Sequence, residues 1–551
     1  MHRRNFLVTV PSALLAASMT VGSVALWPVA TSAASSPDFV PRAEFVSPNI
    51  QRLTAAVRMT KDSNAAGRAF TSPASMLVDP ANPRIIVAAT AQLRTKVCYL
   101  VRSTDAGSTW HILDALPGPA SYPYCTSGNA GVAIASLAWG RHNTLYYARL
   151  GYGANEGGRK NGHASIVLAR STNLGDSFST TLVDNNRGKT GVSAPSDDGV
   201  CGLAVDTSGS SDVVYVGFVQ SFPNAPKGSP LQDGKVEVAV SADGGASFSP
   251  GVSLDAFNHL TQVLAKKSYP LIMKTFFGAP FIAAHDGVVE VVDSAVTPST
   301  DSPPGSSYYP LPPLVARSTD RGRTWSVKAL GPPVFTATGA QTAMGWTSKG
   351  GPHGTFLAAY SATPATSATS GWEDVVLQRS TDEGVTWSAP VVINDDPPQA
   401  LYTSFYPEMG IAPDGRVDVV FEDNRKQAND HFLVGYTYSL DGGLTWSHNV
   451  QVTDQPINFQ LGVSYNGDIR QPPGVASADA YAAIGWADAR LGDVVNQNQD
   501  DFVAMAQLAP LAPASSGVLY LLVAIFGGLI AAAAIVILLL VVRPRRSTKS
   551  G

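Results

Sequence analysis

Apolar residues in the central part of the chain fall into short runs that are separated by polar turn residues. Typical runs are Val97-Cys-Tyr-Leu-Val101, Lys235-Val-Glu-Val-Ala-Val240 and Glu373-Asp-Val-Val-Leu-Gln378. Runs of this length, alternating or continuously apolar and rich in Val, predict β-strands. Each run leads into a turn that contains Ser, Asp and Gly, so the pattern predicts strand–turn–strand units.

The N-terminus departs from this pattern with a longer apolar stretch. His2-Arg3-Arg4 precedes an apolar run over residues 6–26, and small residues follow as far as Ala34. Charge, apolar core and small residues in that order indicate an export signal, which we assign to residues 1–34. Arg3-Arg4-Asn5-Phe6-Leu7 also resembles a twin-arginine signal, with ordinary Sec export as the alternative.

A second long apolar stretch lies near the C-terminus. Residues 518–542 are uncharged and rich in Leu, Ile, Ala and Val, and the basic tail 543–551 follows them. A bilayer-spanning helix needs about 20 apolar residues, and positive charge marks its cytoplasmic side. Residues 509–517 form a short Pro- and Ser-containing spacer. The sequence therefore predicts a single-pass cell-membrane protein with residues 35–508 outside and the tail in the cytoplasm.

One short motif recurs six times between these two ends, at intervals of 59 to 77 residues. Each copy begins with Ser, has Gly at its fifth position and ends in Trp or Phe; the third residues are Asp105, Asn173, Asp243, Asp320, Asp382 and Asp441. The Ser and Asp side chains can bond backbone groups of their own turn, and Gly supplies the positive φ that a tight hairpin needs. Such regular self-similarity predicts a repeat architecture.

The motif Ser-x-Asp-x-Gly-x-Thr-Trp resembles the Asp-box, or bacterial neuraminidase repeat, of the sialidase superfamily of β-propellers. Asn173 replaces Asp in the second copy, and Phe178 and Phe248 replace Trp in the second and third. The resemblance implies an all-β propeller in which each box is a structural turn between the outer two strands of a blade. It also implies that the boxes lie on the face opposite the active site, so they identify the fold and not the reaction.

The number of blades depends on the stretch after the last box. Residues 474–490 align, with a one-residue gap, with residues 410–425 of the preceding unit, and residues 500–506 would form a third strand. No room is left for a fourth strand, but an N-terminal strand within Ile50–Met59 could complete the blade. Closing the ring would remove exposed strand edges. We therefore expect seven blades within residues 35–508, with six as the alternative.

The resemblance to sialidases implies three arginines that hold a carboxylate, a nucleophilic Tyr activated by Glu, and an Asp as acid/base. The early Phe/Tyr-Arg-Ile-Pro motif of that family is missing here. Tyr406, Glu408 and Asp468 lie just before two expected inner strands and are candidates for the Tyr–Glu pair and the acid. Their alternative interpretation is as ordinary loop or pairing residues.

Two strand ends carry the same pair of charged residues, Asp423 with Arg425 and Asp488 with Arg490. Alternation places both members of a pair on one side of the strand. The arginines could point into a central cleft and bind an anionic sugar, because a planar guanidinium suits a carboxylate. Alternatively, each pair could tie neighbouring blades together.

The cysteines, the acidic pairs and the net charge bear on disulfides, metal ions, cofactors and nucleic acid. Cys98 begins an expected third strand and Cys125 lies in the loop to the next blade, so we expect a Cys98–Cys125 disulfide on one face. Acidic loop pairs such as Asp395-Asp396 and Asp500-Asp501 could ligate Ca²⁺, although such pairs are usually solvated. Cys/His metal spacings and nucleotide-binding loops are absent from the sequence, so we expect no metal and no cofactor. A net charge of −4 argues against nucleic acid as a partner.

Three functions fit these observations. The first is a surface-anchored propeller that binds an extracellular glycan or protein ligand through the loops opposite the boxes. The second is an exo-sialidase-type glycoside hydrolase that acts on sialylated or related acidic glycans. The third is a structural propeller whose partner is another membrane protein.

Overall fold

The computed structural model describes residues 40–61, 67–118, 122–125, 135–152, 164–185, 202–220, 235–254, 276–277, 280–293, 295–298, 308–310, 312–330, 342–362, 373–397, 403–425, 431–462 and 472–509. All of them belong to one compact unit that begins at Phe39. The expected export signal, transmembrane segment and cytoplasmic tail lie outside these residues. Within the described ranges, no helix combines the length and apolarity needed to cross a membrane.

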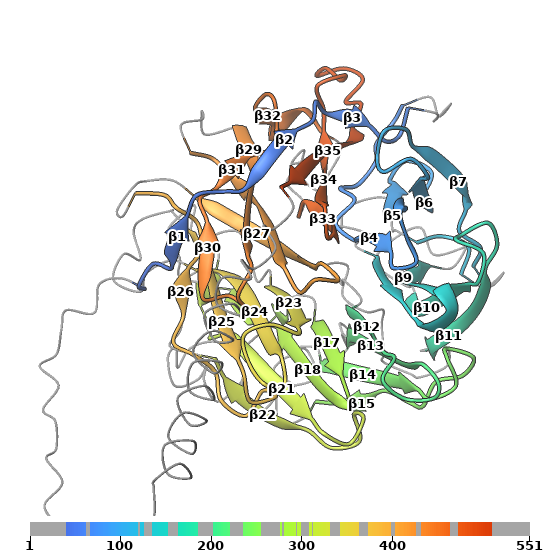
Figure 1. Ribbon diagram of the computed structural model, residues 1–551. Helices are drawn as coiled ribbons and strands as arrows, with labels where there is room; N and C mark the ends of the chain where they lie inside the picture. Colours follow the sequence, from blue (N-terminus) through green and yellow to red (C-terminus); the bar gives the residue numbers. More distant parts are fainter. Residues whose placement is uncertain are drawn as a thin grey trace, which may run out of the picture. The chain divides into compact units, whose positions relative to one another are not determined.

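The described residues form a seven-bladed β-propeller (Figure 1). From the inside outward, the first blade consists of β4 (Met76–Asp79), β5 (Asn82–Gln92), β6 (Val97–Ser103) and β7 (His111–Ala115), and the second consists of β8 (Ser136–Trp139), β9 (Leu145–Tyr152), β10 (Ala164–Ser171) and β11 (Ser179–Asn185). The third blade consists of β12 (Gly202–Asp206), β13 (Val213–Gln220), β14 (Lys235–Ser241) and β15 (Val252–Ser253). The fourth consists of β17 (Phe281–His285), β18 (Val288–Asp293), β21 (Leu314–Ser318) and β22 (Ser326–Ala329).

The last three blades complete the ring. The fifth blade consists of β23 (Thr342–Thr347), β24 (Thr355–Ala362), β25 (Asp374–Ser380) and β26 (Val391–Val392). The sixth consists of β27 (Ser404–Ile411), β28 (Val417–Asp423), β29 (His431–Ser439), β31 (Val450–Gln451) and β32 (Ile457–Asn458). The seventh consists of β33 (Gly474–Ala478), β34 (Tyr481–Asp488), β35 (Asp500–Leu508), β2 (Ile50–Leu53) and β3 (Val57–Arg58).

Short elements lie outside this pattern. The strand β1 (Glu44–Val46) runs parallel to β30 (Thr445–Ser447). A small sheet contains β16 (Phe276–Phe277), β19 (Ala295–Pro298) and β20 (Tyr308–Pro310). Two 3-10 turns, η1 (Arg141–Asn143) and η3 (Phe459–Leu461), are the helical segments of the described chain.

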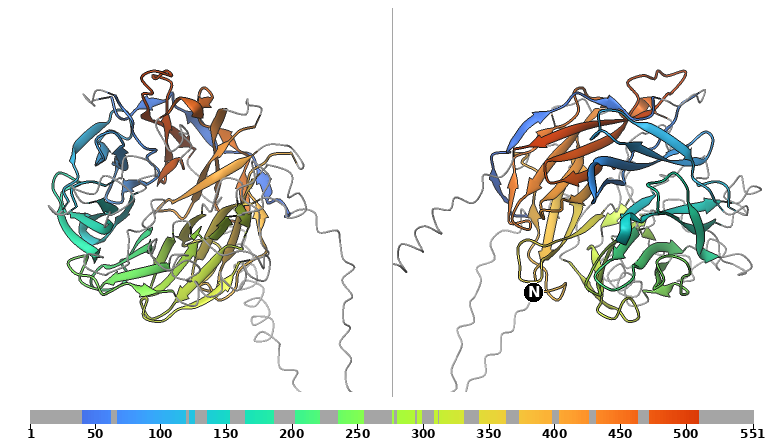
Figure 2. Two further views of the ribbon diagram at one scale, coloured as in Figure 1. Left: turned by 180° about the vertical axis from the view of Figure 1, so that it is seen from behind. Right: turned by 45° about the vertical axis from the view of Figure 1, so that its right-hand side comes forward.

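The N-terminal part of the chain closes the ring. Strands β2 and β3 pair antiparallel with β35, so they supply the outer edge of the seventh blade. Figures 1 and 2 show β2, in blue, alongside the red strands of that blade. The predicted seven blades and the predicted N-terminal closing strand are both confirmed. Closure covers an edge of β35 that would otherwise be free to pair with another chain.

Apolar side chains fill the spaces between the blades. Seven buried clusters lie between successive blades, and the one between the seventh and first blades contains Trp110, Met505 and Tyr481. The box residues Trp110 and Trp446 are fully buried in these clusters. The ring is therefore held by face-to-face packing of twisted sheets, as the apolar runs predict.

The six boxes form the predicted turns between third and fourth strands. In the first box, Ser103 Oγ donates to Asp105 Oδ1 at 2.9 Å and accepts from Gly107 N at 2.9 Å. Asp105 in turn accepts from the backbone and hydroxyl of Thr109, at 2.8 and 2.7 Å. Gly107 has a φ of 85°, which explains the Gly at this position.

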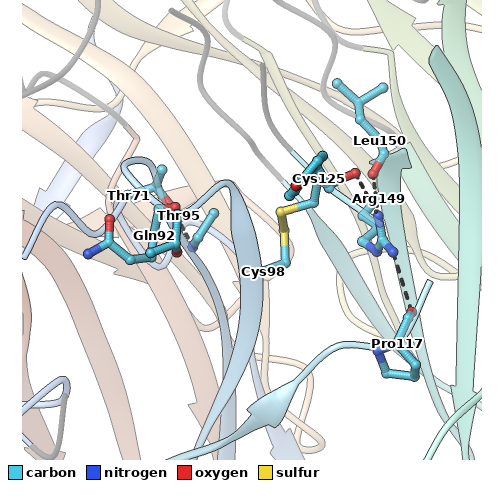
Figure 3. The surroundings of a disulfide bond; sticks show 10 residues. Thr71, Gln92, Thr95, Cys98, Pro117, Cys125, Arg149 and Leu150 are labelled. Atoms are coloured by element: carbon cyan, nitrogen blue, oxygen red, sulfur yellow. Dashed lines mark hydrogen bonds between the residues drawn. A yellow bond between two sulfur atoms is a disulfide. The ribbon is translucent and has the colours of Figure 1, made fainter. Parts of the chain in front are cut away.

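The expected disulfide between Cys98 and Cys125 is present, with the two Cα atoms 5.9 Å apart (Figure 3). It joins β6 to the linker that leads from the first blade to the second. Arg149 lies beside it and is almost fully buried, and its guanidinium donates to the carbonyls of Leu150 and Pro117 at 2.8 and 3.3 Å. A buried charge thus ties the backbone around the disulfide together.

Candidate functional site

The two faces of the propeller carry different turns. Because the strands of each blade are antiparallel, its first and third turns lie on one face and its second turn lies on the other. The first face carries the boxes, and we call it the box face. The second carries the linkers between blades and the loops between second and third strands, and we call it the loop face. Binding sites are found most often on such loops.

A cavity of about 140 Å³ lies on the axis of the ring, and we call it the axial cavity. All seven inner strands contribute to its lining, with one residue from each blade given by Met76, Leu137, Leu203, Ile282, Met344, Glu408 and Val475. In most blades the lining residues are the first ones of the inner strand. Inner strands begin at the loop face, so the axial cavity lies toward that face.

Glu408 is the one ionisable residue among the described residues that line the axial cavity. Its side chain comes from β27, and the residue is 9% exposed. Burial raises the pKa of the Glu408 carboxyl well above its ordinary value, and the backbone N–H of Met409 opposes this shift in part. Arg, Lys and His are all absent from the described lining, so no cation there offsets the charge of the carboxylate.

A backbone irregularity places this carboxyl. The pairing of β27 with β28 shifts between Phe405 and Glu408, because Tyr406 and Pro407 form a β-bulge. Tyr406 has a φ of 54°, which is strained for an aromatic residue, and its N–H donates to Ser361 Oγ at 3.2 Å. Phe405 pairs with Glu422 and Glu408 pairs with Val420, so the bulge brings Phe405 and Glu408 to the same face of the sheet.

The three candidates for a catalytic set have different positions. Tyr406 and Glu408 were expected just before an inner strand, but both lie within β27. Tyr406 is half-buried and does not belong to the described lining of the axial cavity, whereas Glu408 does. Asp468 lies outside the described residues. Of the two candidates that the structure describes, it brings Glu408 to the centre of the ring.

Arg425 is engaged by three carboxylates. Its Nη1 is 2.7 Å from Asp395 Oδ1, and its Nε is 2.8 Å from both Asp396 Oδ1 and Asp423 Oδ2. Burial raises the pKa of Asp423 to about 6 although Arg425 opposes the shift. Burial also disfavours the ionised form of Asp395, but hydrogen bonds from Arg425 and His448 outweigh it and lower the pKa of that carboxyl.

Arg490 has a similar arrangement one blade later. Its Nε donates to Asp488 Oδ2 at 2.7 Å, its Nη1 donates to Asp454 Oδ1 at 2.8 Å, and its guanidinium lies 4.6 Å from the centre of the Phe502 ring. Asp395 and Asp396 belong to the linker before the blade of Arg425, and Asp454 lies between β31 and β32 at the outer edge of the blade before that of Arg490. Both Asp-x-Arg pairs thus join a strand end to a segment that follows the fourth strand of the preceding blade, and neither arginine is part of the described lining of the axial cavity.

The acidic pairs considered as Ca²⁺ ligands have protein partners. Asp395 and Asp396 contact Arg425, and Asp500 contacts Arg58 and Arg68 at 3.2 and 3.0 Å. Within the described part of the chain, no group of three or more His, Cys, Asp or Glu side chains is arranged to hold a metal ion.

Sequence reasoning missed most of the axial cavity. Its lining residues range from Ala74 to Val475, and most of them are apolar residues like those of any buried strand. Their position as the first residues of inner strands is the one signal that they share. The acidic partners of Arg425 and Arg490 were also missed, because Asp395 and Asp454 lie 30 and 36 residues before those arginines.

Comparison with known proteins concerns the fold. No family model matches the chain, and no curated protein matches it. Similar solved structures include an α-L-arabinofuranosidase of Fusarium graminearum, with 14% identity over 73% of this chain and 98% of that chain and a TM-score of 0.39. An α-L-arabinanase of Penicillium chrysogenum has 13% identity over 70% and 98%, with a TM-score of 0.40. The NanB sialidase of Streptococcus pneumoniae has 11% identity over 70% and 68%, with a TM-score of 0.37.

Proposed function

We propose that this protein is a cell-surface β-propeller, anchored by residues 518–542, that binds a glycan or protein ligand on its loop face. The axial cavity is the centre of the proposed site. The observation that carries the proposal is the convergence of all seven inner strands on this cavity, with one buried carboxyl, Glu408, in its wall. Concave sites in which a few polar groups converge are typical of ligand-binding sites.

The path of the chain supports a loop face that is accessible to extracellular ligands. Strand β35 ends at the box face, where Leu508 N donates to Ala480 O at 2.9 Å and Ala509 N donates to Asn49 O at 3.0 Å. The expected spacer 509–517 begins there and is short. A membrane anchor after it would hold the box face near the bilayer, and the loop face would then point away from the cell toward extracellular ligands.

A glycan array can test the binding site with the full-length protein in detergent. Glu408→Gln removes the ionisable carboxyl in the axial cavity, and Leu203→Trp adds volume to a half-buried lining residue of the third blade. We expect both changes to reduce binding at least tenfold. Asp286→Asn is the matched control, because it makes the same kind of change at an exposed turn of the box face. Binding that both cavity variants retain in full would contradict the proposal.

The alternative is an exo-sialidase-type hydrolase that uses Tyr406, Glu408 and Asp468. The observation in its favour is the strained Tyr406 two residues from the carboxyl in the axial cavity. Arg425 and Arg490, which would clamp the sugar carboxylate, are already paired with protein carboxylates. The test is turnover of a fluorogenic sialoside. Turnover that is lost in Tyr406→Phe and in Glu408→Gln would establish the hydrolase, and no turnover above a boiled control would reject hydrolysis of that substrate.

A further inference from the structure

The axial cavity has a size that limits its ligand. Its volume is about 140 Å³. An engineered cavity of roughly 150 Å³ in another protein holds one benzene molecule. A single six-membered ring is therefore the largest compact group that the axial cavity can enclose, and a longer ligand would extend beyond it.

The wall of the axial cavity can form hydrogen bonds with a polar ring. Each inner strand is hydrogen-bonded to a neighbouring strand on one side only, so its other edge faces the axis. Such an edge presents backbone N–H and C=O groups that need partners. Ser75 also belongs to the lining, and its hydroxyl accepts a hydrogen bond from the backbone N–H of Leu137 at 2.9 Å, which leaves the O–H as a donor. A ring that carries hydroxyl groups suits this wall better than a purely apolar ring.

The charge in the axial cavity favours one kind of sugar. A buried carboxylate is unfavourable unless a cation or hydrogen-bond donors compensate it. The described lining supplies no Arg, Lys or His to Glu408, and burial favours the protonated form of this carboxyl by raising its pKa. A ligand cation would stabilise the ionised carboxylate, whereas a sugar carboxylate would add a second negative charge beside it.

We infer that the axial cavity binds a six-membered sugar ring that carries a free amino group, with its ammonium against the Glu408 carboxylate. This inference rests on the proposed binding function and specifies the class of its ligand. It also separates this propeller from proteins that recognise acidic sugars, because an ammonium group stabilises the ionised Glu408 carboxylate and a sugar acid does not.

Ligand-detected NMR titration of the full-length protein can test this inference with three probes. Glucosamine is cationic, glucose is a neutral ring of nearly the same size, and glucuronic acid is an anionic ring of nearly the same size. We expect glucosamine to bind at least tenfold more tightly than either of the others, which corresponds to about 1.4 kcal/mol. Glu408→Gln should abolish this preference and leave the affinity for the neutral sugar unchanged, and Asp286→Asn should preserve both.

The possible failures of the two proposals are distinguishable. If Glu408→Gln retains the preference for glucosamine, or if the sugar acid binds as tightly as glucosamine, the assignment of the ligand class is wrong. If none of the three probes binds, that assignment is also wrong, whereas the proposed function fails only when glycan-array binding is insensitive to Leu203→Trp. Thermal unfolding of each variant shows whether a loss of binding reflects a loss of folding.

Discussion

Asn173 occupies the position that Asp occupies in the other five boxes, and its side chain makes an equivalent turn. In the box of Asp441, the carboxylate accepts from the hydroxyl of Thr445 at 2.7 Å. In the second box the direction is reversed, because Asn173 Nδ2 donates to Ser177 Oγ at 2.9 Å. A hydroxyl can donate or accept, so the turn tolerates the exchange of carboxylate for amide. The geometry of the box therefore depends on the hydroxyl as much as on the aspartate.

Arg425 is the residue whose removal should be most costly at a strand end. Arg425→Ala would leave Asp423 and Asp396 as buried carboxylates without their cation, and we expect the free energy of unfolding to fall by about 3–5 kcal/mol. Urea denaturation measures this change, and Arg84→Ala is the control because Arg84 is exposed. Unchanged stability together with lost ligand binding would show that Arg425 acts on the ligand instead of joining the blade to its linker.

At the scale of elements, the disulfide links a strand to the linker between two blades. Cys98 and Cys125 are 27 residues apart, and closing a loop of that length stabilises a fold by about 3–4 kcal/mol in the chain-entropy description. We expect the double variant Cys98→Ser/Cys125→Ser to lose about 2–4 kcal/mol of unfolding free energy. A reducing agent should lower the stability of the natural protein and leave that of the double variant unchanged. An equal response of both proteins would contradict this explanation.

At the scale of the whole molecule, strands β2 and β3 close the ring. Removing residues 40–60 would expose the edge of β35 and uncover apolar groups that contact Ile50, Leu53 and the fully buried Met59. We expect a loss of at least about 3 kcal/mol of unfolding free energy, as for one or two buried apolar side chains, and self-association through the open edge. Calorimetry and size-exclusion chromatography measure both effects, with a chain that lacks only residues 1–39 as the control. A monomeric variant of unchanged stability would show that closure is dispensable.

The balance of buried carboxyls determines how the stability of the whole propeller depends on pH. Burial raises the pKa of Asp423 to about 6 and raises those of Glu408 and Asp501, so the folded state binds these protons more tightly than the unfolded state and loses stability as the pH rises above about 4. Hydrogen bonds from their own turns lower the pKa of Asp243 and Asp320 to about 2, so the stability that they contribute is lost as the pH falls from about 4 to 2. We expect the thermal midpoint to be highest near pH 4–5. A midpoint that rises steadily from pH 5 to 8 would contradict this expectation.

The features that sequence determined by itself are those encoded by neighbouring residues or by a repeated pattern. The eight residues of a box contain the Ser, Asp, Gly and Thr groups that bond one another within the turn, so the turns could be predicted from composition and spacing. The period, together with the missing fourth strand after the last box, predicted seven blades and their closure by an N-terminal strand. The disulfide could be predicted because both cysteines were expected at one face of adjacent blades.

Only the tertiary structure decided what lies at the centre of the ring. The axial cavity exists because seven strands that are distant in sequence meet on one axis, and no local pattern contains that meeting. Glu408 faces the axial cavity after a bulge at Tyr406 and Pro407. Because the bulge breaks the alternation of side chains along the strand, the direction of the Glu408 side chain could not be inferred from sequence. Arg425 and Arg490 are paired because segments that follow the fourth strands of the preceding blades pass beside them. Contacts between distant segments depend on how the blades pack, and the sequence specifies that packing only through the fold as a whole.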